Sequence, residues 1–124
     1  MDKKSKRILI IEDERPLTMA LELKLKDAGF EIDLAYDGEE GLAKIEKNNY
    51  DLILLDLIMP KKDGFTLLQD MKDKGIKTPV IALTNLSQQE DIDRVKVFGV
   101  DKYFVKSDTP LHQIVDEVKK FLKI

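Results

Sequence analysis

The chain has 124 residues, a formal net charge of −3, 43% apolar and 36% charged residues, and no cysteine. This length suits one domain with a buried core and leaves no room for a second folded domain. The missing cysteines exclude disulfides and thiolate metal sites, and the charge gives no electrostatic reason to expect direct nucleic-acid binding. The longest apolar runs are too short for a signal peptide or a membrane span, so we expect a cytoplasmic protein without membrane insertion.

Five short apolar stretches predict β-strands at residues 7–11, 31–35, 51–55, 79–83 and 102–105, each bounded by acids, Gly, Pro or Asn. After each of them, apolar residues recur at helical spacing, within 17–28, 42–45, 67–71, 92–98 and 111–122. Pro16 suits a first helical turn, Gly29 and Gly75 suit helix ends, and Ser87 with Glu90 has the spacing of a capping box.

The order of these elements predicts an α/β protein. The strands at 8–11 and 52–55 are continuously apolar, which is typical of parallel strands covered on both faces. Right-handed crossovers between five such strands give a doubly wound (βα)₅ sandwich of three layers around a five-stranded parallel sheet.

Chemically active side chains follow four of the predicted strands. Glu12-Asp13-Glu14 come after the first strand, Asp56 after the third, Thr84 after the fourth and Lys106 after the fifth. The carboxyl ends of parallel strands share one edge of the sheet, where ligands of open α/β folds bind. Two carboxylates about 4 Å apart repel by roughly 4 kcal/mol at an effective dielectric near 20, so we expect a cation among them.

The residue types at this edge suit a hard cation and phosphoryl transfer. Oxygen ligands without His or Cys favour Mg²⁺. An aspartate can attack phosphorus, while lysine and a hydroxyl hold phosphoryl oxygens. Taken singly, the acids would be helix caps or turn formers, the threonine strand filler and the lysine a surface amine. Their joint placement at one edge favours a site.

A family resemblance rests on two segments, Ile8-Leu9-Ile10-Ile11-Glu12-Asp13-Glu14 and Leu52-Ile53-Leu54-Leu55-Asp56-Leu57-Ile58-Met59-Pro60, and on Asp63-Gly64, Thr84 and Lys106. They resemble the receiver domains of bacterial two-component response regulators, including single-domain receivers similar to chemotaxis regulators. The resemblance implies a flavodoxin-like sheet with strand order 2-1-3-4-5 and one receiver domain over residues 1–124 without an output domain.

By this resemblance, Asp56 accepts a phosphoryl group from a sensor histidine kinase. It implies that Mg²⁺ is held by Asp13 directly, by Glu12 through water, by Asp56 and by the carbonyl of Ile58. Thr84 and Lys106 are the further catalytic residues of the family pattern, and Thr84 with Tyr103 forms the switch. The only histidine, His112, is expected on the surface, so the phosphodonor must belong to another protein. The output would be a downstream protein or a homodimer through the last two helices and the strand between them.

Four positions distinguish this chain from the family pattern. Ser107 replaces a common proline after the lysine, so we expect either a trans Lys106-Ser107 peptide with a reshaped loop or a strained cis bond. Asn85 replaces a small residue beside the phosphoryl path and should slow transfer. Ile58 and Leu86 flank the expected route of the hydrolytic water, and as apolar side chains they should prolong the phosphoryl state.

Three other functions compete with a receiver that catalyses only its own phosphorylation and slow dephosphorylation. A pseudo-receiver or scaffold would keep the fold without phosphorylation. A flavodoxin-like FMN protein would need a hydroxyl-rich phosphate loop, which Glu12-Asp13-Glu14 would repel. A metal-dependent phosphohydrolase would need a group that activates water, and neither Ile58 nor Leu86 can serve as one.

Overall fold

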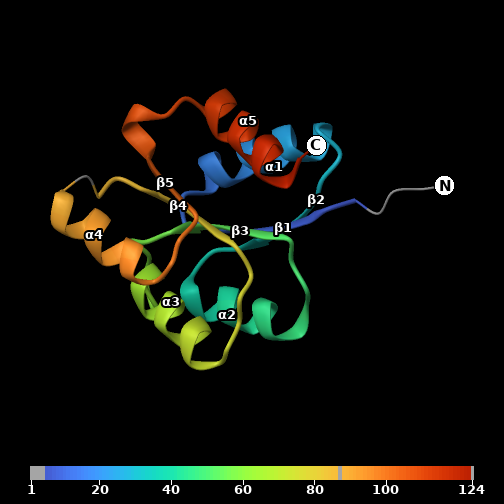
Figure 1. Cartoon of the computed structure of the whole chain (residues 1–124). Helices are drawn as coiled ribbons and strands as arrows, with labels where there is room; N and C mark the ends of the chain where they lie inside the picture. Colours follow the sequence, from blue (N-terminus) through green and yellow to red (C-terminus); the bar gives the residue numbers. More distant parts are fainter. Residues whose placement is uncertain (1–4, 87, 124) are drawn as a thin grey trace.

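The computed structural model describes residues 5–86 and 88–123. Strands and helices alternate along this part of the chain (Figure 1). The strands are β1 (Arg7–Ile11), β2 (Glu31–Ala35), β3 (Leu52–Asp56), β4 (Val80–Thr84) and β5 (Lys102–Val105). The helices are α1 (Arg15–Asp27), α2 (Gly38–Lys47), α3 (Gly64–Asp73), α4 (Gln89–Val97) and α5 (Leu111–Leu122), with a 3₁₀ turn, η1 (Lys106–Asp108), before the last.

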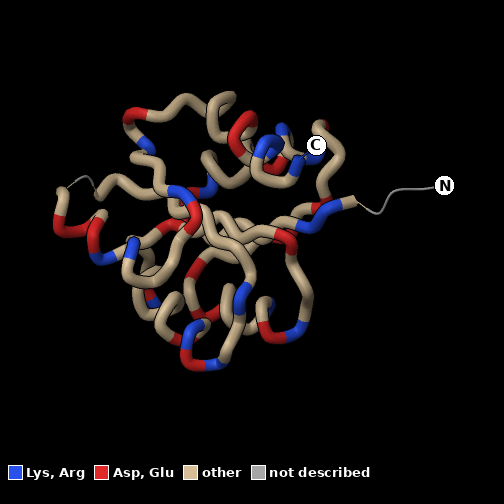
Figure 2. The backbone as a smooth tube through the Cα atoms, viewed as in Figure 1, with Lys and Arg blue, Asp and Glu red and all other residues tan. Residues whose placement is uncertain are grey.

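The strands form one parallel sheet in the order β2-β1-β3-β4-β5, which confirms the predicted (βα)₅ fold and strand order. Figure 1 shows α1 and α5 on one face of the sheet and α2, α3 and α4 on the other. Charged residues lie mostly on the helices and loops around this sandwich, whereas the strands are largely free of them (Figure 2). Within the described ranges, no helix is long and apolar enough to cross a membrane.

Two apolar cores hold the helices to the sheet, because alternate residues of each central strand face opposite layers. In β1, Leu9 and Ile11 contact the layer of α2, α3 and α4, whereas Ile8 and Ile10 contact that of α1 and α5. All four side chains are fully buried. Each such burial contributes about 1.5–3 kcal/mol, so the central strands are the most strongly held part of the sheet.

Strands β3 and β4 each begin one residue later than predicted, and they end on Asp56 and Thr84. Just before β3, the carboxylate of Asp51 accepts a hydrogen bond from the backbone N–H of Arg7 at 2.8 Å. At the other end, Asp56 pairs with Leu83, and Thr84 pairs with Val105. The two functional candidates are therefore part of the sheet ladder and do not lie in the loops.

Most predicted helix boundaries are confirmed. Pro16 lies in the first turn of α1, and Gly29 and Gly75 follow helix ends with φ values of 98° and 70°. Asp63 caps α3 by accepting a hydrogen bond from the backbone N–H of Thr66 at 2.8 Å. Ser87 lies outside the described residues, so the capping box of α4 stays a prediction.

Candidate functional site

The carboxyl edge of the sheet brings together the acids, the hydroxyl and the amine that the sequence predicted there. Glu12 and Asp13 follow β1, Asp56 ends β3, Thr84 ends β4 and Lys106 follows β5. Strands β1, β3, β4 and β5 are consecutive neighbours in the sheet, so their ends lie side by side.

Lys106 is the cationic centre of this edge. Its Nζ atom lies 2.5 Å from Oε1 of Glu12, 3.0 Å from Oε1 of Glu14 and 3.2 Å from Oδ2 of Asp56. The contact with Glu14 joins residues 92 positions apart, and Glu14 was not among the predicted metal ligands or catalytic residues. One ammonium group is thus shared among three carboxylates.

Two acids of this cluster, Glu12 and Asp56, have perturbed pKa values because they are buried. Glu12 is 1% and Asp56 4% exposed. Burial raises the pKa of Glu12 to about 7, although the hydrogen bond with Lys106 opposes the change. Burial likewise raises the pKa of Asp56 against the opposing charge of Lys106. Burial alone would lower the pKa of Lys106, but the carboxylates around it reverse this effect and raise it.

The donor set fits a hard divalent cation. Glu12, Asp13 and Asp56 each offer a carboxylate oxygen, and these oxygens lie within 4.8 Å of one another. Lys106 pairs with Glu12, Glu14 and Asp56, and Asp13 adds a fourth carboxylate beside them. The excess of negative charge and the all-oxygen ligand set favour Mg²⁺. Ile58 lies beside this set, and its backbone N–H donates to Oδ1 of Asp56 at 3.2 Å.

Thr84 and Tyr103 both contact Leu86. Leu86, Ile58 and Asn85 are the three residues predicted to modulate the transfer or loss of the phosphoryl group. The fully buried Thr84 accepts a hydrogen bond at Oγ1 from the backbone N–H of Leu86 at 3.3 Å. The hydroxyl of Tyr103 donates to the carbonyl oxygen of Leu86. Burial, followed by the charge of Asp91, raises the pKa of this phenol, so Tyr103 is a neutral donor. The two predicted switch residues are therefore coupled through one loop residue.

Asn85 and Ser107 are in direct contact. The backbone N–H of Ser107 donates to Oδ1 of Asn85 at 3.1 Å. No cis peptide bond occurs in the described part of the chain, so the Lys106-Ser107 peptide is trans, the first of the two predicted forms.

A hollow of about 340 Å³ lies above Asp56. Its lining combines the acids and the lysine with the three predicted modulating residues, namely Asp13, Glu14, Asp56, Ile58, Asn85, Leu86 and Lys106. Of the apolar residues in it, Ile58 is 56% exposed. The hollow gives a reagent access to the carboxylate of Asp56.

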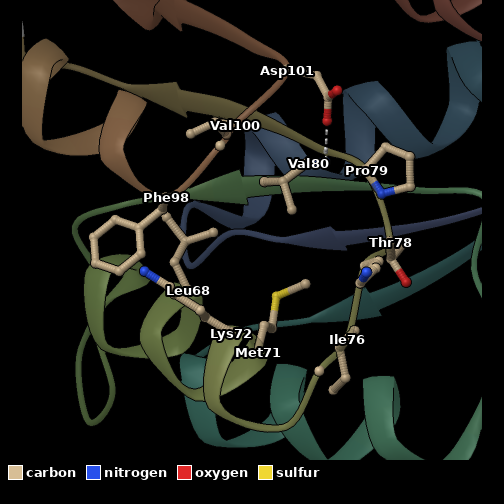
Figure 3. A pocket seen from close by; sticks show the side chains of 13 residues that line it. Leu68, Met71, Lys72, Ile76, Thr78, Pro79, Val80, Phe98, Val100 and Asp101 are labelled. Atoms are coloured by element: carbon tan, nitrogen blue, oxygen red, sulfur yellow. Dashed lines mark hydrogen bonds between the residues drawn. The ribbon is translucent and has the colours of Figure 1, made fainter.

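A second hollow, of about 360 Å³, lies at the opposite end of β4 (Figure 3). Figure 3 shows Leu68, Met71 and Phe98 around it, and the carboxylate of Asp101 accepting a hydrogen bond from the backbone N–H of Val80 at 3.1 Å. Its lining carries Lys72, Lys77, Thr78 and Asp101 but no cluster of acids. The carboxyl edge is therefore the better candidate for a metal-dependent reactive site.

Comparison with known proteins supports this choice. The family described as the response regulator receiver domain matches residues 8–119. The transcriptional regulatory protein DltR of Streptococcus agalactiae is 40% identical over 81% of this chain and 45% of its own length. ResD of Bacillus subtilis is 39% identical over 94% of this chain and 48% of its own length. The chain thus spans about half the length of the curated relatives it matches.

Solved structures agree with the fold. The receiver domain of the Francisella response regulator 1452 superimposes with a TM-score of 0.88 at 32% identity, covering 96% of this chain and 98% of that one. TrrA from Thermotoga maritima, solved in complex with Mg²⁺ and BeF, has a TM-score of 0.77 at 34% identity and covers 95% of this chain and 96% of its own.

Proposed function

Because this chain belongs to the family of response regulator receiver domains of two-component systems, we propose that it accepts a phosphoryl group from a sensor histidine kinase on Asp56. The observation that carries this proposal is the contact of Asp56 with Lys106 at 3.2 Å inside a cluster of acids at the carboxyl edge of the sheet. That arrangement supplies a nucleophile, a cation for the phosphoryl oxygens and ligands for Mg²⁺.

In the proposed reaction, a carboxylate oxygen of Asp56 attacks phosphorus and the bond from phosphorus to the donor histidine nitrogen breaks. The ammonium of Lys106 moves from the carboxylate to a phosphoryl oxygen, and the hydroxyl of Thr84 binds another. Bound Mg²⁺ would offset the negative charge of the transferred group. Its ligands would be Asp13, Asp56 and the carbonyl of Ile58, with Glu12 acting through water.

The proposed output is a change at the surface formed by α4, β5 and α5. To reach a phosphoryl oxygen, Thr84 would leave the hydrogen bond that it accepts from the backbone N–H of Leu86. The carbonyl oxygen of the same Leu86 accepts a hydrogen bond from Tyr103. A shift of this loop therefore changes the position of Tyr103 on β5. Phosphorylation would bias two existing states of the α4-β5-α5 surface. A downstream protein or a second copy of the chain would bind the favoured state.

The apolar residues beside the hollow support a long-lived phosphoryl group. Ile58 and Leu86 line it and carry no group that could orient or deprotonate water. We expect dephosphorylation to take far longer than seconds, which a time course of the phosphorylated fraction after removal of the donor would measure. Complete loss within seconds would refute this expectation.

The test of the proposed function is intact mass after incubation with Mg²⁺ and acetyl phosphate, on the wild type and on Asp56→Ala. One phosphoryl adduct on the wild type, absent from the variant and from a sample with EDTA, would support it. If neither acetyl phosphate nor a partner kinase modified the wild type and beryllofluoride with Mg²⁺ also failed to bind, the alternative of a non-phosphorylated scaffold would replace it.

A further inference from the structure

The loops after β4 and β5 are joined by a hydrogen bond that the family pattern does not require. We infer that Asn85 is a positioning residue, which ties the two loops together so that Lys106 is held over Asp56 when the phosphoryl group binds. This inference rests on the proposed function, because it assigns Asn85 a part in binding the phosphoryl group.

The bond sits between the two groups proposed to hold phosphoryl oxygens. Asn85 directly follows Thr84, and Ser107 directly follows Lys106. The backbone pairing of β4 with β5 ends at Thr84 and Val105. Just beyond these residues, the backbone N–H of Ser107 donates to Oδ1 of Asn85 at 3.1 Å and links the loops that follow the two strands. The side chain of Asn85 thus continues the connection between the strands where the backbone pairing ends.

The bond needs two of the residues that depart from the family pattern, Asn85 and Ser107. Its donor is a backbone N–H, which a proline at position 107 would lack. Its acceptor is a side-chain carbonyl oxygen, which alanine or glycine at position 85 would lack. Because the amide oxygen must face the N–H donor, the orientation of the Asn85 amide is fixed by chemistry. The two departures are therefore complementary parts of one contact.

The contact matters for Lys106 because three acids compete for its ammonium group. Lys106 is the first residue of η1, in a loop whose next residues, Ser107 and Asp108, are exposed. On one side this loop is held by Thr109, whose hydroxyl donates to the carbonyl of Val105 at 2.8 Å. On the other side Asn85 holds it. Fixing the backbone at both sides reduces the conformational freedom that Lys106 loses when it turns to a phosphoryl oxygen.

The experiment measures beryllofluoride binding in saturating Mg²⁺ by isothermal titration calorimetry. Asn85→Ala, which removes the acceptor, and Ser107→Pro, which removes the donor, should each weaken binding by about two- to fivefold, the effect of one exposed neutral hydrogen bond. Ser107→Ala keeps the backbone N–H and should bind as the wild type does.

The double variant Asn85→Ala with Ser107→Pro separates a shared bond from two independent disturbances. Its affinity for beryllofluoride should be no lower than that of the single variant with the lower affinity. Mg²⁺ binding without beryllofluoride should stay unchanged in all of them, since Asp13 and Asp56 do not contact the bridge, and thermal unfolding verifies that each variant is folded.

The inference would be overturned, with the proposed function intact, if the fold-losses of affinity in the two single variants multiplied in the double variant. Wild-type affinity in Asn85→Ala would overturn it in the same way. Equal weakening by Ser107→Ala would also overturn it, because the side chain of Ser107 would then be responsible. Absence of beryllofluoride binding to the wild type would overturn the proposed function, and this inference with it.

Discussion

Replacing Asp13 with asparagine should make the metal-free protein more stable. Carboxylate oxygens of Glu12, Asp13 and Asp56 lie within 4.8 Å of one another. Two unit charges at that distance repel by about 3.5 kcal/mol at an effective dielectric of 20 and about 0.9 kcal/mol in water. Lys106 already contacts the other two acids. Because Asp13 is exposed, screening reduces the repulsion, and we expect a gain of about 1–2 kcal/mol in the free energy of unfolding.

Urea unfolding followed by far-ultraviolet circular dichroism measures this change, since the chain has no tryptophan for fluorescence. In EDTA the variant should be more stable than the wild type. Mg²⁺ at about 100 times its dissociation constant should stabilise the wild type by about 2.7 kcal/mol. It should stabilise Asp13→Asn much less. In Mg²⁺ the wild type should therefore be as stable as the variant or more stable.

Asp116→Asn is the matched control, because Asp116 is an exposed acid on α5 and its replacement changes the net charge equally. Its unfolding free energy should stay within about 0.5 kcal/mol of the wild type with or without Mg²⁺. A destabilised Asp13→Asn in EDTA would refute the argument from charge repulsion. An undiminished Mg²⁺ response in that variant would refute the assignment of Asp13 as a ligand.

Three further changes test the packing at the start of α2, a hydrogen bond between β2 and the segment before β3, and the hollow at the site. Gly38→Ala would place a methyl group against the carbonyl oxygen of Lys62, so it should destabilise the protein by about 1–3 kcal/mol in urea unfolding, and an unchanged midpoint would contradict this. Tyr50→Phe removes a 2.6 Å hydrogen bond to Asp33 and should cost about 1 kcal/mol at pH 7. Burial and Asp33 raise the pKa of Tyr50, so its phenol ionises at lower pH in the unfolded chain than in the folded one. The stability of the wild type should therefore fall as pH rises above about 10. The phenylalanine variant should not show this part of the decline. Leu86→Gln puts a polar group beside Asp56 and should speed phosphoryl loss by about fivefold in a mass time course, whereas an equal or longer lifetime would count against a role of Leu86 in excluding water.

The fold was predictable because its signals are local. The apolar runs of β1 and β3 are buried on both faces, so the sequence shows them as continuous hydrophobic segments. The order of elements then leaves few topologies, since parallel crossovers are right-handed. The error of one residue in β3 and β4 arose because Asp56 and Thr84, as polar residues, were expected to stop the strands. Backbone pairing with Leu83 and Val105 continues through them.

The contacts of the site were less predictable than its members. Parallel strand ends must share an edge, so the gathering of Asp56, Thr84 and Lys106 followed from topology alone. The pairing of Glu14 with Lys106 and that of Asn85 with Ser107 depend on side-chain and loop conformations between residues 92 and 22 positions apart. No local pattern encodes either contact, because Glu14, Asn85 and Ser107 are, taken alone, ordinary exposed polar residues.

The position of each strand in the sheet suggests why the proposed nucleophile and the proposed switch differ in freedom. Strands β1 and β3, which lead to Glu12 and Asp56, lie inside the sheet, and Ile8–Ile11 and all of β3 are buried. Strand β5 is an edge strand, and none of its residues is fully buried. Local opening costs least where few apolar contacts hold the backbone. A covalent change at Asp56 would therefore leave β1 and β3 in place and act on the loop after β4, which holds Asn85 and Leu86, and on Tyr103 of β5.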